Sequence, residues 1–294
     1  MSWGTRHLQT AMAGRLVPSV GVVSALAGIA MLSVVFAAGA LGSTRTDQAT
    51  LTDNGQIGTA TAHCPGNQRA TGGGFSASPP MFTMSSYTYA QVFASRKVGQ
   101  RGWRAAAEEV TSTPAEMTFT AYAYCAKHAP RTTSAVHSVP VALGASNFTA
   151  SDASCSSGKA RAGGFALSTP NYDGSLVASQ RHGKRGWRTR IDGDGVTVTS
   201  YAYCAGGPAP KSRTGTVGST GSESGTAFSE PCPGGRPALA GGFAQPDAIT
   251  GFAGSSYRNF VPYESKRSSS RWRSSGRHGG NTTSHLVAIA YCRG

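Results

Sequence analysis

The hydrophobic pattern divides the chain into one long apolar segment followed by a much longer polar region of alternating character. No charged residue lies between Arg15 and Arg45, and positions 20–41 are almost all apolar or small. As an α-helix, this stretch would span about 33 Å at roughly 1.5 Å per residue, enough to cross a bilayer core. Residues 16–42 therefore predict a transmembrane anchor or a signal segment.

Two readings of this segment stay open. Signal-peptide cores are usually shorter, about 7–15 residues, which favours an anchor, whereas Ala38-Gly39-Ala40 offers a small-residue cleavage site. Arg6 and Arg15 precede the segment, so residues 1–15 are expected to stay in the cytoplasm and the rest to be exported. We therefore expect a cell-membrane protein with an extracytoplasmic C-terminal region, or a secreted one after cleavage. The membrane is the expected partner of residues 16–42.

Beyond this segment the periodicity is that of β-strands. In residues 196–204, one face carries Val196, Val198, Ala202 and Cys204, and the other carries threonine and tyrosine. The same alternation places a cysteine on the apolar face at two further sites, formed by Met117, Phe119, Ala121, Ala123 and Cys125, and by Leu286, Ala288, Ala290 and Cys292. The segment around Trp187 reads as another strand. The turn at residues 192–195 predicts that it forms a hairpin with the Cys204 strand.

These strands belong to a pattern that occurs three times. Each copy has a cysteine, a Gly-Gly-Phe triplet about ten residues later, an arginine-flanked tryptophan and a Tyr-Cys pair. The copies run from Cys64 through Gly73-Gly74-Phe75 and Trp103 to Cys125, from Cys155 through Gly163-Gly164-Phe165 and Trp187 to Cys204, and from Cys232 through Gly241-Gly242-Phe243 and Trp272 to Cys292. The run before each Phe reads as a strand whose paired glycines indicate a bulge or a close backbone approach. We predict an all-β protein of three tandem modules.

The cysteines are expected to form disulfides, because export places them in an oxidising compartment and their number is even. Six cysteines allow 15 pairings. The repeat selects the one in which each copy closes on itself, Cys64–Cys125, Cys155–Cys204 and Cys232–Cys292. Each bond would close a loop of about 50–60 residues, worth roughly 4 kcal/mol in the chain-entropy model. Such help matters because 39 glycines leave little apolar material for each core.

Composition suggests where the modules begin and end. The polar stretch 43–57 reads as a spacer, and 129–146 and 207–225 read as flexible linkers rich in Ser, Thr, Gly and Pro. The modules would then occupy residues 58–128, 147–206 and 226–294. Whether they are independent beads or pack as a prism around a pseudo-threefold axis stays open, and the linkers favour beads. The sequence indicates no oligomeric state.

The set Cys-Pro-x-Gly, Gly-Gly-Phe, Trp and Tyr-x-x-Cys resembles a repeat module of exported actinobacterial proteins. Cys64-Pro65 and Cys232-Pro233 carry the first element, whereas Cys155-Ser156 departs from it, and the final element agrees only in part. The resemblance covers most of residues 58–294. It implies an exported, disulfide-stabilised β module and brings no activity or site residues with it.

Positive charge is the main hint of function. Lysine and arginine outnumber acids by 27 to 13, and only two of these cations precede the apolar segment. The tryptophans are expected in the core, so the arginines beside them should project from the opposite face. They form the candidate polyanion-binding set Arg101, Arg104, Arg181, Lys184, Arg185, Arg188, Arg190, Lys266, Arg267, Arg271, Arg273 and Arg277. A solvated basic face with no ligand is the alternative.

Signals for catalysis are weak. Ser156-Ser157-Gly158-Lys159 matches Ser-x-x-Lys without its companion motifs, and the histidines have no metal-ligand spacing. We therefore expect no catalytic residue, metal or cofactor. The expected role is non-catalytic binding or structure outside the cell, with anionic wall polymers or glycans as candidate partners. Nucleic acid is not expected, because export separates the protein from the genome. The alternatives are a hydrolase directed at the cell wall and a ligand-free extracellular spacer.

Overall fold

A computed structural model describes residues 42–294 except 79–80, 83–86, 114, 143–147, 170–173, 194, 220–222, 249–258 and 279–282. The expected cytoplasmic N-terminus and, apart from Gly42, the expected anchor lie outside these residues. Among the residues that the structure does describe, no helix is long and apolar enough to cross a membrane.

The described region is all-β, as predicted, and each copy of the pattern supplies six main strands. Repeat 1 comprises β1 (Ser43–Leu51), β2 (Ile57–His63), β3 (Arg69–Ala77), β5 (Tyr87–Val98), β6 (Gly102–Thr111) and β7 (Met117–Ala126), and the short β4 (Met81–Phe82) pairs with β5. Repeat 2 comprises β8 (Thr133–Pro140), β9 (Thr149–Ser154), β10 (Lys159–Leu167), β11 (Gly174–His182), β12 (Gly186–Gly193) and β13 (Thr197–Ala205). Repeat 3 comprises β14 (Lys211–Ser219), β15 (Ser224–Phe228), β16 (Ala240–Ala244), β17 (Phe260–Ser268), β18 (Arg271–His278) and β19 (Ser284–Cys292), with a 3₁₀ turn, η1 (Pro233–Gly235), before β16.

Four strands of every repeat carry a characteristic residue, and each is named after that residue. The glycine strands are β3, β10 and β16; the serine strands, which carry Ser95, Ser179 and Ser265, are β5, β11 and β17; the tryptophan strands are β6, β12 and β18; the cysteine strands are β7, β13 and β19.

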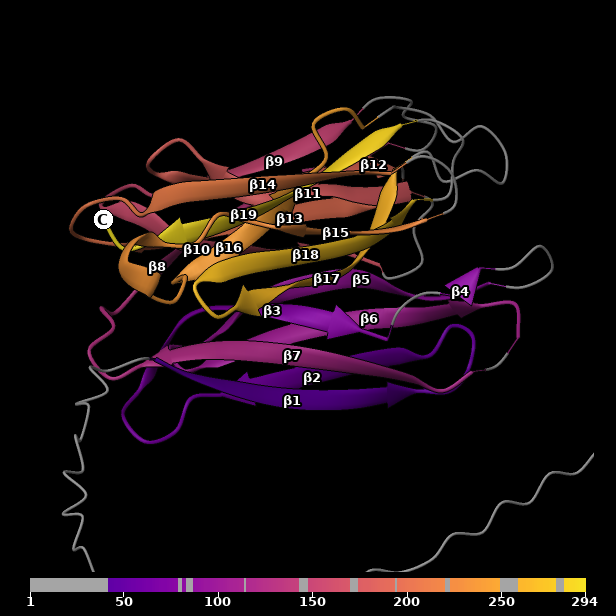
Figure 1. Ribbon diagram of the computed structural model, residues 1–294, viewed down its shortest axis with the longest axis horizontal. Helices are drawn as coiled ribbons and strands as arrows, with labels where there is room; N and C mark the ends of the chain where they lie inside the picture. The colour runs from indigo at the N-terminus through magenta and orange to yellow at the C-terminus, as the bar shows by residue number, and fades with distance from the viewer. Residues whose placement is uncertain are drawn as a thin grey trace, which may run out of the picture. The chain divides into compact units, whose positions relative to one another are not determined.

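No sheet belongs to a single repeat. Sheet A has the order β1-β7-β3-β17-β18-β15, sheet B the order β2-β6-β5-β10-β13-β8, and sheet C the order β14-β19-β16-β11-β12-β9. In each sheet the glycine strand of one repeat pairs with the serine strand of another, as β3 does with β17 in Figure 1. Because repeat 1 joins repeat 3, repeat 3 joins repeat 2 and repeat 2 joins repeat 1, the exchange closes a circle. The repeats therefore form a prism of three antiparallel sheets and are not independent beads.

The expected hairpin in repeat 2 is wrong. The Trp187 strand, β12, pairs with β11 and β9 in sheet C, whereas the Cys204 strand, β13, pairs with β10 and β8 in sheet B. The chain between β12 and β13 therefore leads from one sheet to another. Alternation shows which residues of a strand are buried, and it leaves the pairing partner undetermined.

The stretches expected to be spacer and linkers contain strands. The spacer contributes β1, the first linker β8 and the second linker β14, each paired along the full length of a cysteine strand. They are the outermost strands of their sheets, and most of their side chains are exposed. Main-chain hydrogen bonds hold them, so their polar composition is compatible with a regular strand.

The core lies between the sheets, along the pseudo-threefold axis. The three Gly-Gly-Phe triplets and the three tryptophans gather there. A Cβ on Gly163 would lie 2.0 Å from the Trp187 ring, and one on Gly164 would lie 2.3 Å from the Ser95 carbonyl oxygen of repeat 1. The same two contacts occur in the other repeats. The expected close approach is confirmed, since the first glycine admits the indole and the second admits the neighbouring repeat.

The predicted disulfides are confirmed, and each joins two sheets. The bond Cys64–Cys125 connects the end of β2 in sheet B to β7 in sheet A, Cys155–Cys204 connects sheet C to sheet B, and Cys232–Cys292 connects sheet A to sheet C. The three bonds therefore lie at the same end of the prism. Gly42, where the described chain begins, lies at this end beside Cys125.

Candidate anion-binding end

The tryptophan of each repeat is buried, as the sequence predicts, and it lies at a seam between two repeats. Trp187 is 1% exposed, donates from Nε1 to Ser179 Oγ at 3.0 Å and meets the Tyr291 ring of repeat 3 edge-on at 5.4 Å. The Tyr291 hydroxyl accepts the backbone N–H of Arg181 at 2.6 Å. The other seams repeat the set with Trp103, Ser95, Tyr203 and Lys97, and with Trp272, Ser265, Tyr124 and Arg267. Burial raises the pKa of these tyrosines well above the usual value.

In each repeat, the lysine or arginine two residues after the serine binds the segment that leads into the first strand of a neighbouring repeat, which is β8, β14 or β1. The Arg181 guanidinium stacks on Tyr291, donates to the Pro210 carbonyl and reaches Ser212 Oγ at 3.1 Å. Arg267 does the same with Gly42 and Thr44. Two residues of the candidate polyanion set, Arg181 and Arg267, therefore stabilise contacts between repeats. Burial away from water lowers the pKa of both.

Two further candidates bind the chain beside a disulfide. Arg101 donates from Nε and Nη2 to the Cys64 carbonyl at 3.1 and 2.8 Å, and Arg185 donates to the Cys155 carbonyl at 2.9 Å. The equivalent residue in repeat 3, Arg271, is exposed, and its side chain makes no hydrogen bond or ion pair with other described residues.

The outward face of the tryptophan strand in repeat 2 is partly neutralised. Arg188 donates from Nε and Nη2 to the two oxygens of Asp152, each at 2.8 Å, and His182 lies 3.0 Å from the same carboxylate. Hydrogen bonds from Arg188 lower the pKa of Asp152 and raise that of Arg188. Arg190 stacks over the Phe148 ring at 3.7 Å. In repeat 1, the equivalent Arg104 donates to Thr61 Oγ1 at 3.3 Å.

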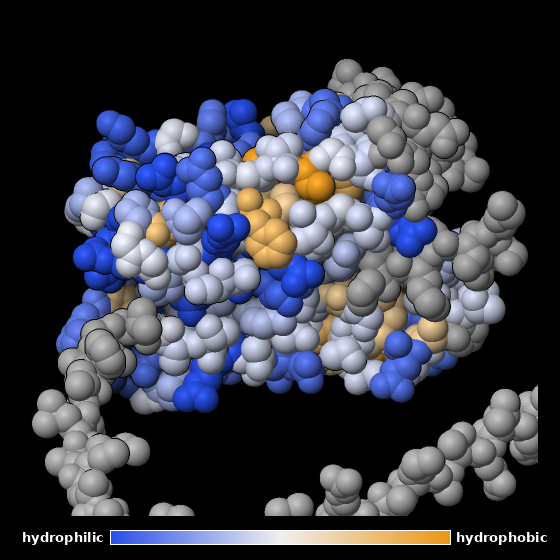
Figure 2. All heavy atoms as spheres, in the orientation of Figure 1, coloured by the Kyte–Doolittle hydropathy of each residue, from blue (hydrophilic) through white to orange (hydrophobic). Residues whose placement is uncertain are grey.

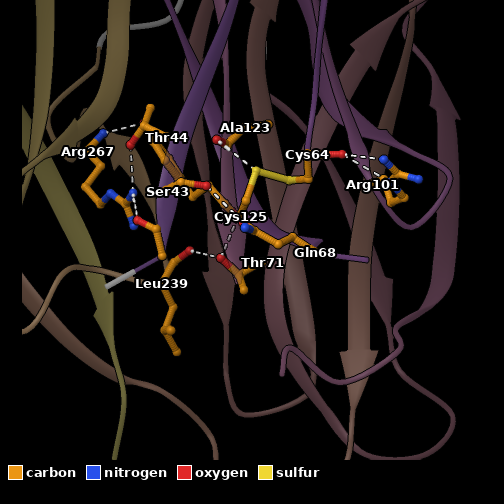
Figure 3. Close-up of a disulfide and its surroundings, with 12 residues drawn as sticks. Ser43, Thr44, Cys64, Gln68, Thr71, Arg101, Ala123, Cys125, Leu239 and Arg267 are labelled. Atoms are coloured by element: carbon orange, nitrogen blue, oxygen red, sulfur yellow. Dashed lines mark hydrogen bonds between the residues drawn. A yellow bond between two sulfur atoms is a disulfide. The ribbon is translucent and has the colours of Figure 1, made fainter. Parts of the chain in front are cut away.

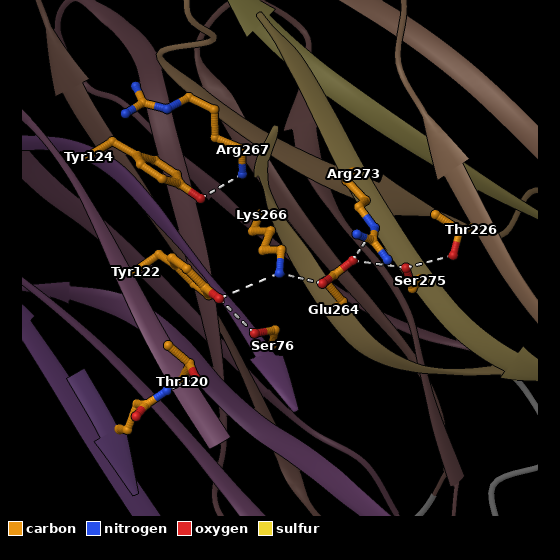
Figure 4. A network of polar contacts seen from close by, with 11 residues as sticks. Ser76, Thr120, Tyr122, Tyr124, Thr226, Glu264, Lys266, Arg267, Arg273 and Ser275 are labelled. Carbon is orange, nitrogen blue, oxygen red and sulfur yellow. Dashed lines mark hydrogen bonds and ion pairs between the residues drawn. The ribbon is translucent and has the colours of Figure 1, made fainter. Parts of the chain in front are cut away.

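In repeat 3 a buried carboxylate forms ion pairs with two of the candidate cations. Glu264 lies 2.6 Å from Lys266 Nζ and 2.6 Å from Arg273 Nε, and it accepts from Ser275 at 3.0 Å. Figure 4 shows this network extending through Lys266 to Tyr122 of repeat 1. Alanine occupies the equivalent position in the other two repeats, so this neutralisation is specific to repeat 3. Arg277 lies further along β18 and also has a partner.

The lysines and arginines that are not neutralised by an acid gather at the end of the prism where the disulfides lie, here called the basic end. This end includes the turns between serine and tryptophan strands, the starts of β1, β8 and β14, and Arg293 after β19. Among the described lysines and arginines, only Arg190 and Arg277 lie in the half of the prism beyond it. The acids Asp53, Glu116, Asp192, Glu223 and Asp247 lie in or beside turns at the opposite end. The prism is therefore strongly polarised in charge, and such a field attracts polyanions to one end.

The surface seen in Figure 2 is mainly hydrophilic, with small separate apolar patches and a dense hydrophilic region at the left, where the C-terminus lies in Figure 1. Lys127, Lys184 and Arg271 are exposed at the basic end, one from each repeat. Their side chains make no hydrogen bond or ion pair with the described residues. They can therefore attract an anionic ligand at long range and also bind it directly.

Acidic and histidine side chains do not converge. Within the described part of the chain, no group of three or more His, Cys, Asp or Glu residues could hold a metal ion. His182 and His285 each pair with a single aspartate. Glu108 and Glu109 lie inside β6, and burial raises the pKa of both carboxyls.

The sequence interpretation missed the serines that receive the tryptophan N–H. A signal was present, since a serine stands seven or eight residues before each tryptophan, with a lysine or arginine two residues after that serine. No protein-family model matches the chain, and no curated protein shows significant similarity to it.

Proposed function

We propose that this protein is an exported, membrane-anchored, non-catalytic binder of anionic envelope polymers or glycans, and that it binds them through its basic end. The single observation that carries the proposal is the sorting of charge: nearly all described lysines and arginines lie in the half of the prism with the disulfides, whereas Asp53, Glu116, Asp192, Glu223 and Asp247 lie at the other end. A basic surface that served solubility alone would have no need of such polarity. Three disulfides support an oxidising, extracytoplasmic location.

The path of the chain connects the basic end to the expected anchor. The expected spacer is strand β1, so the described strands begin at the residue that follows the expected anchor, and they begin at the basic end.

The test uses residues 39–294, which form one compact unit. We expect this fragment to be retained on immobilised polyphosphate and polygalacturonate at low salt and released as salt rises, because the contacts are charged. Lys127→Gln, Lys184→Gln and Arg271→Gln combined should weaken binding at least about tenfold. The reason is that each cation near an anionic surface contributes up to about 1 kcal/mol to the binding free energy.

The control changes net charge equally at the other end. Thr52→Glu, Thr113→Glu and Ser224→Glu occupy exposed sites there, and this variant should bind almost as well as the parent. Equal weakening by both sets would show that net charge alone matters. An absence of binding to anionic polymers would contradict the proposal and favour a ligand-free spacer.

A further inference from the structure

The prism has three equivalent corners at the basic end, where a cysteine strand ends and the first strand of the next repeat begins. A linker fills the first corner: Arg69 donates to the Ala129 carbonyl at 2.7 Å, and Gln100 donates to the Thr132 carbonyl at 2.8 Å. A second linker fills the next corner, where Arg161 donates to the carbonyls of Gly206 and Pro208. In both corners an arginine side chain therefore donates to main-chain carbonyls of the linker.

The third corner lies between β19 and β1, the last and the first of the described strands, and no linker within the described residues fills it. A cavity of about 340 Å³ occupies this corner. Its walls include Gly42 and Ala126 of repeat 1 and the segment 236–239 of repeat 3. Arg267, Leu239, Thr71 and Cys125 are among the lining residues and are labelled in Figure 3. The volume is within the range of small-ligand sites.

The lining differs from that of the filled corners in a way that argues against a peptide. The residues equivalent to Arg69 and Arg161, which hold the linkers, are Pro237 and Leu239 here. Neither side chain can donate a hydrogen bond to a carbonyl. An extended segment of the linker type would therefore lack the contacts that Arg69 and Arg161 make in the other two corners.

Three guanidinium groups line the cavity instead. Arg236 and Arg293 are exposed and make no hydrogen bond or ion pair with other described residues. Arg267 also lines the cavity, and it donates to Gly42, Thr44 and Ala238 from its Nη atoms. No acidic side chain is among the lining residues, and burial lowers the pKa of Arg267, as expected for a cation without a counter-charge.

We propose that this corner is a binding site for one oxyanion group, a carboxylate or a phosphate carried by a compact ligand or by a unit of a polymer. Arg236 and Arg293 would bind its oxygens with their planar forks of donors. Arg267 would add positive charge from behind, and Pro237, Leu239 and Ala126 would contact the less polar part of the ligand. The inference deepens the proposed function, because the corner belongs to the basic end. It adds the requirement for a single, saturable site.

Small probes separate this site from general attraction. Calorimetry of residues 39–294 with inorganic phosphate, glycerol phosphate and glucuronate should show saturable binding of one equivalent of at least one probe, and the preferred probe distinguishes phosphate from carboxylate. Arg236→Gln combined with Arg293→Gln should weaken that binding at least about tenfold, because both substitutions remove charge-assisted hydrogen bonds to the oxyanion. Leu239→Trp should weaken it as well by filling the cavity while every arginine remains.

The matched control is Lys184→Gln combined with Arg271→Gln, which removes two charges from the basic end outside the cavity. This variant should keep its affinity for the small probe within about twofold. Equal losses in the two double variants, or no saturable binding of any probe, would overturn the corner site. Retention of polymer binding in that case would leave the proposed function standing, whereas loss of polymer binding with retained probe binding would contradict the proposed function alone.

Discussion

The axis and the basic end of this prism are built from the same three repeats, yet they differ in how faithfully the repeats agree. Around the axis every repeat supplies Gly-Gly-Phe, a tryptophan and the serine that receives its N–H, with hydrogen bonds of 2.9–3.0 Å. At the basic end the repeats diverge. Glu264 neutralises two cations in repeat 3, Asp152 pairs with Arg188 in repeat 2, and one corner is open while two are filled.

This difference separates structural need from specialisation. The axis has to fit three times over in a space with no room for a Cβ, so one solution recurs. The basic end is under no such steric limit, and its side chains differ from repeat to repeat. The regions where the repeats differ are therefore the better place to look for a ligand.

The axis should be the more sensitive of the two regions to a single methyl group. In Gly164→Ala the new Cβ would lie 2.3 Å from the Ser95 carbonyl oxygen and 3.0 Å from the Arg96 Cα, at a junction between repeats. We expect the free energy of unfolding to fall by about 3 kcal/mol, or folding to fail. Gly206→Ala, at the basic end, meets nothing within 4 Å and is the control. Similar midpoints of urea denaturation for the two variants would contradict this account of the axis.

The disulfides test how much structure the basic end contributes. Cys155→Ser with Cys204→Ser opens a loop of 49 residues between sheets C and B. The chain-entropy model gives a loss of about 4 kcal/mol. Denaturation followed by circular dichroism measures the loss, and the parent protein under the same conditions is the reference. A midpoint unchanged from that of the parent would show that strand exchange alone holds this end together.

The smallest expected effect concerns pH. The folded-state pKa of Asp152 is lowered, so its pairing with Arg188 stabilises the fold above the unfolded pKa, near 4, and is lost as pH falls through the folded value. Because Asp152 and Arg188 are each more than a third exposed, the contribution should stay under about 1 kcal/mol. Asp152→Asn should therefore lower stability slightly at pH 7 and not at pH 2. Asp53→Asn, at the opposite end, is the control, and an equal loss at both pH values would refute the assignment.

Much of this fold could be predicted from local pattern. Alternation placed Val196, Val198, Ala202 and Cys204 on a buried face, and all four are less than 5% exposed. The repeat selected the three disulfides. The local pattern could not predict which strands pair. β10 has the same buried face whether its neighbour comes from its own repeat or from repeat 1.

The first strand of each repeat shows a second limit. β8 and β14 have mostly exposed side chains, so they have none of the apolar alternation that predicts a strand. Their order comes from main-chain pairing with β13 and β19, to which side-chain composition gives little guide. Composition alone therefore predicted linkers.

The candidate site was predicted as a charge pattern and not as a geometry. Clusters such as Arg181 to Arg190 are genuine in sequence, but Arg181 holds a neighbouring strand and Arg188 is paired with an acid. The cavity residues Arg236 and Arg293 lie 57 positions apart in the chain, outside both predicted clusters. Only the circular arrangement of strands brings them together.

The exchange of strands has a consequence for assembly. A lone repeat folded as it is here would leave one edge of its glycine strand and one edge of its serine strand unpaired, and two further copies related by threefold rotation would supply both missing neighbours. The present chain is equivalent to such a homotrimer in which two of the three junctions between subunits have become covalent. The third junction is still made only by contact, as it would be between separate subunits.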